Sequence, residues 1–428
     1  MDTVKNMNRF ALAAVVVLSF SSCALSQVAF SVVQVPGSSP NSPIAINNSG
    51  QVLVNTGTTT SSHVSTWNRQ SGAQSVAFAG VGSGGTDINN AGDVVGVGDP
   101  DNSGNLQAFF WQPAGGAEWL GSLGGDWSTA SAVNDNGAVV GVSYTAAETK
   151  HAFLWTQAGG MQDLTPNVFS LGGATATGIN SANEVVGYYF PNGSLKSLGF
   201  YWTQDGGVQD VGAAGTIAFA VNGAGTIVGQ APIANGYKHA FSWTQAGGMK
   251  DLGALGVESS ALSINSSGWV VGTTLATAGK GLLHGFLWTA TAGMKDLTTL
   301  AGLANTEQIY SAQVNDLGVI AISTNKGGYI LLPKVTGTFG SSANPAVVGQ
   351  PVTLTANLTS IAGAPADGVT VKFMMGTTVL GTGTLHGGVA QITTSSIPAG
   401  SHVIKVTYAG DVSHLAVNFT ALTQVVNH

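Results

Sequence analysis

Histidine and aspartate recur at matched positions along this chain, and these residue types could bind a metal ion or act as an acid–base pair. Histidines stand four residues before a repeated tryptophan at His63, His151, His239 and His284. Aspartates stand eight residues after it at Asp163, Asp210, Asp251 and Asp296. A group that recurs in successive copies normally does the same packing or hydrogen-bonding job in each, whereas a catalytic site should break the symmetry. We therefore interpret His151, His239 and His284 as structural residues.

Few polar segments break this symmetry. "DPDNSGN" (99–105) opens like a calcium loop, but Phe110 stands where its final glutamate would fall, which favours a hairpin turn. Loop carboxylates occur at Asp126, Glu148, Glu258 and Glu307, and nothing in the sequence pairs them. Nucleophile-elbow, zinc-protease, P-loop and dinucleotide-binding motifs are absent from the sequence. We expect no enzymatic activity, no metal and no cofactor.

These residues belong to a repeat whose first motif resembles "AVNDNGAVVG" and whose second resembles "HAFLWTQAGGMQDL". The first motif places an asparagine at Asn47, Asn89, Asn134, Asn180, Asn222, Asn265 and Asn315. The second places a tryptophan at Trp67, Trp111, Trp155, Trp202, Trp243 and Trp288. Successive copies lie 41 to 50 residues apart, which is the period of a β-propeller rather than that of a helical solenoid.

Each repeat predicts four short strands, because β-branched and aromatic runs alternate with Asn-Gly and Gly-Gly turns. Four strands in about 44 residues, repeated radially, make a propeller blade. The seventh unit lacks a fourth strand, and "VAFSVVQV" (28–35) could supply it. We predict a seven-bladed propeller over residues 27–333, closed by this N-terminal strand.

The paired motifs "HAF-W-x-GGM-DL" and "IN-G-VVG" resemble the HAF family of bacterial extracellular repeat proteins. The resemblance covers roughly residues 28–333. It implies little mechanism, because the repeat defines the family and carries no agreed activity.

The repeat pattern ends before a linker at 334–342, and the sequence after it has a different pattern. "PVTLTANLT" alternates, with Val352, Leu354, Ala356 and Leu358 on one face, and "HVIKVTY" places Ile404, Val406 and Tyr408 inward. Such strands predict a small β-sandwich over residues 343–428. The run "IPAGSHVIKVTYAGD" resembles bacterial Ig-like domains, which implies a spacer or adhesive module without catalytic residues.

The first 26 residues read as a signal peptide. Lys5 and Arg9 precede an apolar stretch of about eleven residues, and Ala24 and Ser26 suit a signal-peptidase site. An alternative is lipid anchoring through Cys23, whose "FSSC" context is a poor lipoprotein box. We expect an exported protein, free in the medium or at the cell surface, without a transmembrane segment.

Composition limits the partners. Only 8% of residues are charged, against about 25% in a typical soluble domain. The net charge of −7, without a basic cluster, excludes nucleic acid as an expected partner.

The most divergent segments of the repeats are 98–107, 122–131, 188–197 and 299–310. They offer four candidate ligand-binding residues, Trp127, Tyr188, Tyr189 and Tyr310.

In a propeller, specificity must come from loops that differ between blades. These segments are loops before the first strand of a blade or loops between its second and third strands, and both kinds can lie on the same face. We therefore predict a monomeric recognition or adhesion protein that binds a neutral glycan, a surface polymer or another surface protein on one rim. Two alternatives stay open: a glycosidase or lyase with carboxylates converging at the axis, and a purely structural envelope protein.

Overall fold

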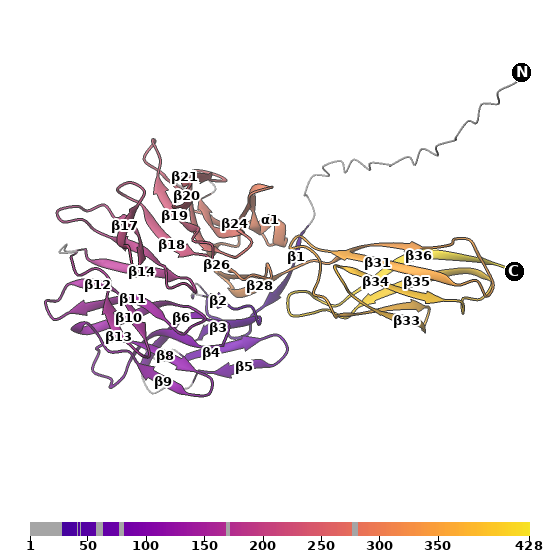
Figure 1. The fold of residues 1–428 in the computed structure, drawn as a ribbon, viewed down its shortest axis with the longest axis horizontal. Helices are drawn as coiled ribbons and strands as arrows, with labels where there is room; N and C mark the ends of the chain where they lie inside the picture. The colour runs from indigo at the N-terminus through magenta and orange to yellow at the C-terminus, as the bar shows by residue number, and fades with distance from the viewer. Residues whose placement is uncertain are drawn as a thin grey trace, which may run out of the picture.

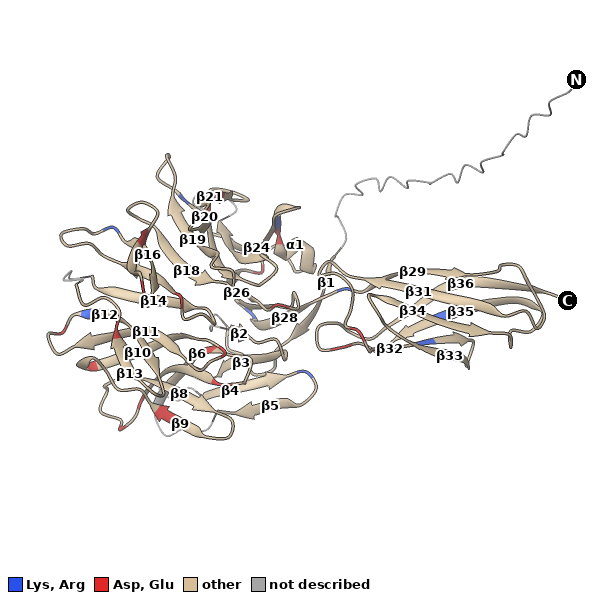
Figure 2. Ribbon diagram, in the orientation of Figure 1, with Lys and Arg blue, Asp and Glu red and all other residues tan. Residues whose placement is uncertain are grey.

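The computed structural model describes residues 28–40, 42, 44–56, 63–76, 81–167, 172–275 and 281–428. They form an all-β molecule with a ring of sheets at one end and an elongated sandwich at the other (Figure 1). The predicted signal peptide and Cys23 lie outside the described residues. Charged residues are sparse along the ribbon of both parts (Figure 2), in keeping with the composition.

In the described part of the chain, seven four-stranded antiparallel sheets make up the ring, and we call each sheet a blade. Blade 1 contains β2–β5 (Ile44–Ile46, Gln51–Thr56, His63–Asn68, Gly72–Ser75). Blade 2 contains β6–β9 (Val81–Ile88, Val94–Asp99, Gln107–Gln112, Gly116–Trp119). Blade 3 contains β10–β13 (Gly124–Val133, Val139–Thr145, Lys150–Thr156, Gly160–Asp163).

The next three blades follow the same strand order. Blade 4 contains β14–β17 (Ala174–Ile179, Val185–Tyr189, Leu198–Thr203, Gly207–Val211). Blade 5 contains β18–β21 (Ile217–Val221, Ile227–Pro232, Lys238–Thr244, Gly248–Gly253). Blade 6 contains β22–β25 (Glu258–Ile264, Val270–Leu275, Leu283–Thr289, Gly293–Asp296). A short helix, α1 (Leu297–Ala301), then leads into the last blade and overlaps the start of the predicted divergent segment 299–310.

Blade 7 joins the two ends of the ring. Its first three strands are β26 (Ile309–Val314), β27 (Ile320–Thr324) and β28 (Gly327–Pro333). Its fourth strand is β1 (Phe30–Gln34), which pairs antiparallel with β28 from Phe30 opposite Pro333 to Gln34 opposite Tyr329. The predicted closure by the N-terminal strand is confirmed, and it covers an edge of β28 that would otherwise be open to pairing.

The hydrophobic core of the ring lies between blades rather than within them. Each pair of neighbouring blades shares one cluster of buried apolar side chains, including the pair formed by blades 7 and 1. The phenylalanine that stands two residues before the repeated tryptophan is fully buried in five blades, at Phe109, Phe153, Phe200, Phe241 and Phe286. Burial of each such side chain contributes about 1.5–3 kcal/mol. A single blade would expose both of its apolar faces, so the blades stabilise one another.

The glycine of the "VVG" motif permits a bulge in the innermost strand. In blade 5 the register shifts between Ala218 and Ala220, and a Cβ on Gly229 would lie 2.0 Å from the Ile217 carbonyl oxygen. Equivalent glycines with equivalent approaches occur in blades 2, 3, 4 and 6. Blade 1 carries Val54 at this position, and its innermost strand pairs without a shift. Blade 7 carries Ile322 at this position, and the register shift of its innermost strand falls elsewhere. The glycine is therefore needed in the five blades whose bulge lies opposite it.

The C-terminal domain is a β-sandwich of two sheets. One contains β29, β31 and β34 (Thr336–Ser341, Val352–Thr359, Val389–Thr394). The other contains β30, β36, β35, β32 and β33 (Ala346–Val347, Val417–Asn427, Gly400–Tyr408, Thr370–Met375, Thr378–Thr384).

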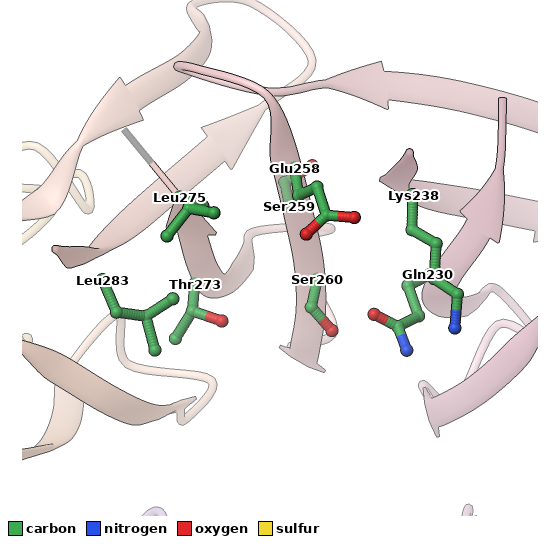
Figure 3. Close-up of a pocket in the computed structure, with 8 residues that line it drawn as sticks. All are labelled: Gln230, Lys238, Glu258, Ser259, Ser260, Thr273, Leu275 and Leu283. Atoms are coloured by element: carbon green, nitrogen blue, oxygen red, sulfur yellow. The ribbon is translucent and has the colours of Figure 1, made fainter. Parts of the chain in front are cut away.

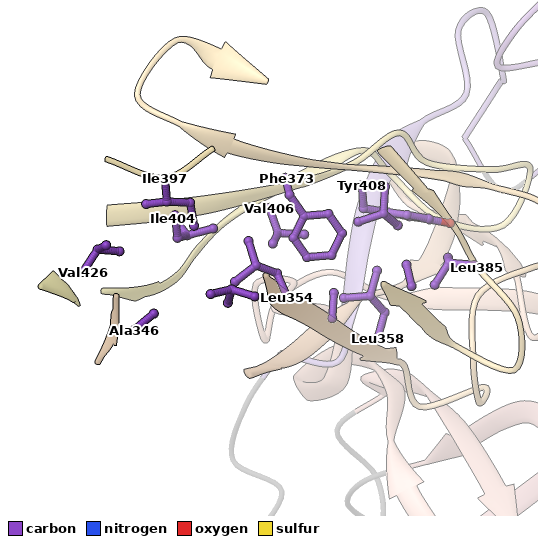
Figure 4. Packing of buried hydrophobic residues seen from close by; sticks show 14 residues of the cluster. Ala346, Leu354, Leu358, Phe373, Leu385, Ile397, Ile404, Val406, Tyr408 and Val426 are labelled. Atoms are coloured by element: carbon purple, nitrogen blue, oxygen red, sulfur yellow. The ribbon is translucent and has the colours of Figure 1, made fainter. Parts of the chain in front are cut away.

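The side chains predicted to point inward in the sandwich are at most 3% exposed, and they form its core with Phe373 (Figure 4). β29 lies within the segment that the sequence predicted as linker, so the sandwich begins earlier and only a few residues separate it from β28.

Candidate functional site

The strand order gives the ring two different faces. Turns between strands one and two, and between strands three and four, lie on one face, which we call the Asn face. Loops between strands two and three, and those that lead into the next blade, lie on the other, which we call the loop face. All four divergent segments predicted from the sequence belong to the loop face.

A closed ring of hydrogen bonds links the seven repeat asparagines on the Asn face. Each side-chain Nδ2 donates to the backbone carbonyl of the asparagine in the next blade, at 2.8–3.1 Å, and Asn315 returns to Asn47. Each side-chain oxygen also accepts backbone N–H groups of its own turn, such as those of Ala224 and Thr226 on Asn222. These asparagines are at most 8% exposed, and their hydrogen-bonding capacity is committed to the fold. We name this feature the asparagine ring.

The sandwich domain packs against the Asn face near blades 7 and 1. The Arg69 guanidinium donates to the backbone carbonyls of Asp411 and His414. Val412 lies against Gly50 and Ala362 against Gly318, in the first turns of these two blades. Asp411 is itself held by Tyr408 and His414; burial opposes ionisation, but these hydrogen bonds hold the pKa of Asp411 well below its usual range. Part of the Asn face is therefore covered by a built contact.

Three of the four recurrent histidines pair with the aspartates of their own blades, whereas blade 1, with His63, carries Ser75 at the aspartate position. The His Nδ1 to Asp oxygen distances are 2.7 Å for His151–Asp163, 3.0 Å for His239–Asp251 and 2.9 Å for His284–Asp296. Each pair joins the third strand to the fourth, and Asp296 also accepts the Thr299 N–H that begins α1. Among the described residues, no group of three or more His, Cys, Asp or Glu is placed to hold a metal ion. The pairs can therefore stabilise the contact between the third and fourth strands of their blades.

The "DPDNSGN" segment also engages its own backbone. The Asp99 side chain accepts the N–H groups of Ser103 and Gly104 at 3.1 and 2.8 Å. Such bonds within one loop are typical of a turn. The remaining loop carboxylates lie in different environments, and Glu307 is buried against Lys326 at 2.9 Å.

An aromatic cluster lies on the loop face of blade 3. Trp127 contacts Tyr144 with ring centroids 5.6 Å apart, and the Lys150 ammonium lies 5.8 and 5.7 Å from the two rings. Tyr188 contacts Phe190 in blade 4 at 6.0 Å. The Gly172–Gly173 entry to blade 4 lies between the pairs, because a Cβ on Gly172 would meet Phe190 and one on Gly173 would meet Lys150. We call Trp127, Tyr144, Lys150, Tyr188 and Phe190 the aromatic surface.

Two of the four predicted ligand-binding residues, Trp127 and Tyr188, thus belong to the aromatic surface. The other two, Tyr189 and Tyr310, do not. The Tyr189 hydroxyl donates to Asp210 at 2.9 Å, and burial together with this bond raises the pKa of Tyr189 to about 12. Tyr310 is 37% exposed but is the second residue of the innermost strand of blade 7, three blades beyond Tyr188. The predicted set is therefore not one cluster. Tyr144, Lys150 and Phe190 were missed, because their proximity depends on cross-strand pairing.

A pocket of about 410 Å³ opens between blades 5 and 6 (Figure 3). Gln230, Lys238 and Glu258 line one part of it, and Leu275 and Leu283 another. Sequence reasoning had found Glu258 only as an isolated carboxylate, because Gln230 and Lys238 come from the preceding repeat. The pocket and the aromatic surface distinguish the loop face from the repetitive Asn face.

Comparison with known proteins identifies one domain. Residues 339–427 match the family described as bacterial Ig-like domain (group 3). No curated protein matches the sequence significantly. Among the described residues, no helix has the length and apolarity needed to cross a bilayer.

Similar solved structures include virginiamycin B lyase from Staphylococcus aureus, with 9% identity and a TM-score of 0.44 over 71% of this chain and 98% of that one. A gluconolactonase from Xanthomonas campestris has 10% identity and a TM-score of 0.41 over 71% and 89%. The extracellular domain of a hybrid two-component system from B. thetaiotaomicron has 10% identity and a TM-score of 0.32 over 91% and 69%. At these identities the similarity concerns the fold alone.

Proposed function

We propose that this protein is an exported, non-enzymatic recognition protein that binds a neutral glycan or surface polymer through its loop face. The observation that carries the proposal is the aromatic surface, which spans blades 3 and 4 where the repeat pattern is broken. The Ig-like domain, a module that suits a surface role, packs on the opposite face. This arrangement leaves the aromatic surface free to meet a polymer.

The chemistry of the aromatic surface suits sugar rings. Flat aromatic side chains offer large apolar area at little cost in conformational entropy, and Tyr and Trp also offer a polar group. The contact between Trp127 and Tyr144, with Lys150 beside both rings, fixes the ring orientations before a ligand arrives. A pre-oriented site loses less entropy on binding. A neutral polymer also avoids the cost of removing water from a charged ligand.

Replacement of Trp127 tests the proposal. The exported protein would be screened on a glycan and polysaccharide array, and its best ligand would be titrated against the parent and the Trp127→Ala variant. We expect binding to weaken about tenfold, which corresponds to ~1.4 kcal/mol. Tyr237→Ala is the matched control, because Tyr237 is 39% exposed in a loop of blade 5 outside the aromatic surface.

Circular dichroism and thermal melting would show that both variants are folded. Equal binding by the parent and Trp127→Ala would contradict the proposed site. Release of new reducing ends or unsaturated products from the bound polymer would contradict the non-enzymatic proposal. N-terminal sequencing of the exported protein should begin at Gln27, whereas a lipid-modified Cys23 would show that it is anchored.

A further inference from the structure

The pocket between blades 5 and 6 contains two opposite charges that are not used by the fold. Lys238 is the first residue of β20, and Glu258 is the first residue of β22. Within the described part of the chain, neither side chain forms an ion pair within 4.0 Å or a hydrogen bond, and the Gln230 side-chain amide forms no hydrogen bond either. By contrast, Lys326 and Glu307 pair directly at 2.9 Å. A free cation and a free anion thus share one hollow.

The positions of these groups are complementary to a ligand rather than to each other. In Figure 3 the Glu258 carboxylate points toward the side of the pocket that holds Gln230 and Lys238. Leu275 and Leu283 lie on the other side of β22, and the hydroxyls of Ser260 and Thr273 lie between. One half of the pocket is therefore charged and polar, and the other half is apolar.

We propose that this pocket binds a small zwitterion of the amino-acid class with an apolar side chain. The ligand carboxylate would pair with Lys238 and its ammonium group with Glu258, with the Gln230 amide able to bond either. The apolar side chain would lie against Leu275 and Leu283. The volume of about 410 Å³ lies within the range of small-molecule sites, toward the lower end.

Charge arithmetic favours a zwitterion over other small ligands. A neutral sugar would remove water from both charges without neutralising either, and unpaired buried charge is costly. A simple anion would pair with Lys238 but would be repelled by Glu258, and a simple cation would meet the reverse problem. Only a ligand with both charges can pair with Lys238 and Glu258 at the same time. This site is separate from the aromatic surface, so the proposal does not depend on the proposed glycan recognition.

Calorimetric titration of the exported protein with L-leucine and two derivatives tests the assignment. N-acetyl-L-leucine lacks the ammonium charge, and L-leucinamide lacks the carboxylate. We expect leucine to bind and each derivative to bind at least tenfold more weakly. Glucose and D-galacturonate serve as the neutral and acidic sugar probes, and neither should compete with leucine.

Two variants assign the charges to their residues. Glu258→Gln should weaken leucine at least tenfold and abolish its advantage over N-acetyl-leucine. Lys238→Met should weaken leucine similarly and abolish its advantage over leucinamide. Glu118→Gln and Lys196→Met are matched controls at exposed positions in blades 2 and 4, and they should bind leucine like the parent.

Equal binding of leucine and its derivatives, tighter binding of galacturonate, or absence of leucine binding to the folded parent would each overturn the proposal. Binding of the array polymer would be measured on the same variants. Loss of leucine binding with unchanged polymer binding separates this site from the aromatic surface.

Discussion

Replacement of Asn222 by alanine should destabilise the whole ring of blades. Asn222 is 8% exposed, and its side chain makes three hydrogen bonds: it donates to the Asn265 carbonyl at 3.1 Å and accepts from Ala224 and Thr226 at 3.1 and 3.0 Å. Alanine removes all three and leaves their partners behind. Position 226 carries an uncharged threonine where blades 2 and 4 carry Asp93 and Glu184, so no charged partner complicates the result.

The magnitude follows from the number of partners that lose their bonds. A buried polar group without a partner costs about 1–3 kcal/mol. The two turn N–H groups lie near the surface and can form hydrogen bonds with water instead. The free-energy cost therefore comes mainly from the unpaired Asn265 carbonyl, with a smaller part from the turn. We expect a loss of about 2–4 kcal/mol, out of a total stability of about 5–15 kcal/mol.

Urea unfolding followed by tryptophan fluorescence would measure this loss, because six of the repeats carry a tryptophan near the blade contacts. Asn235→Ala is the matched control: Asn235 makes one exposed bond to the Tyr237 N–H, and its loss should cost under about 1 kcal/mol. If the two variants unfold at the same urea concentration, the asparagine ring is not a source of stability and our reasoning fails.

Three further changes should behave as follows. Deletion of residues 27–36 should remove β1, expose β28 and lower the melting temperature more than deletion of the Ig-like domain does; unchanged melting would mean that closure does not depend on β1. His151→Ala should cost about 1–3 kcal/mol and His239→Ala less, because the Asp251 side chain is 54% exposed against 28% for Asp163; the reverse order in urea unfolding would contradict the role of burial. Burial raises the pKa of Asp87 to about 7, although backbone hydrogen bonds to its carboxylate oppose the increase. Protonation of Asp87 therefore stabilises the folded state. This stabilisation is complete below about pH 4 and is lost as the pH rises to 7. Asp87→Asn should therefore be more stable than the parent at pH 8, with a difference that shrinks from pH 7 to pH 4, and a difference independent of pH would refute this assignment.

The architecture was predictable because it depends on patterns that repeat. The asparagine and tryptophan spacings indicated the blade, and the incomplete last unit indicated that β1 completes it. The bulge opposite Gly229 and its counterparts was not predicted, although the glycine marks it. Blades 1 and 7 carry Val54 and Ile322 at this position, and they have no register shift at that point.

The candidate sites were harder to predict because they depend on contacts between repeats. Trp127 was identified as a ligand-binding residue of a divergent segment, but its contact with Tyr144 follows from strand pairing within blade 3. Lys238 and Glu258 lie in different repeats, so no local motif could join them. Tyr310 was grouped with Trp127 by composition, whereas the ring separates them by several blades. A common loop class indicates a common face but not a common place on it.

The asparagine ring also bears on how such a molecule could arise. Every bond in it runs in the same sense, from the side chain of one blade to the backbone of the next. In the language of oligomers this is a heterologous, head-to-tail interface, which must either close or grow into an open filament. A gene segment that encodes one blade therefore already encodes both halves of the contact with its own copy. Tandem duplication could lengthen the chain without inventing a new interface, and growth would end when the last copy met the first.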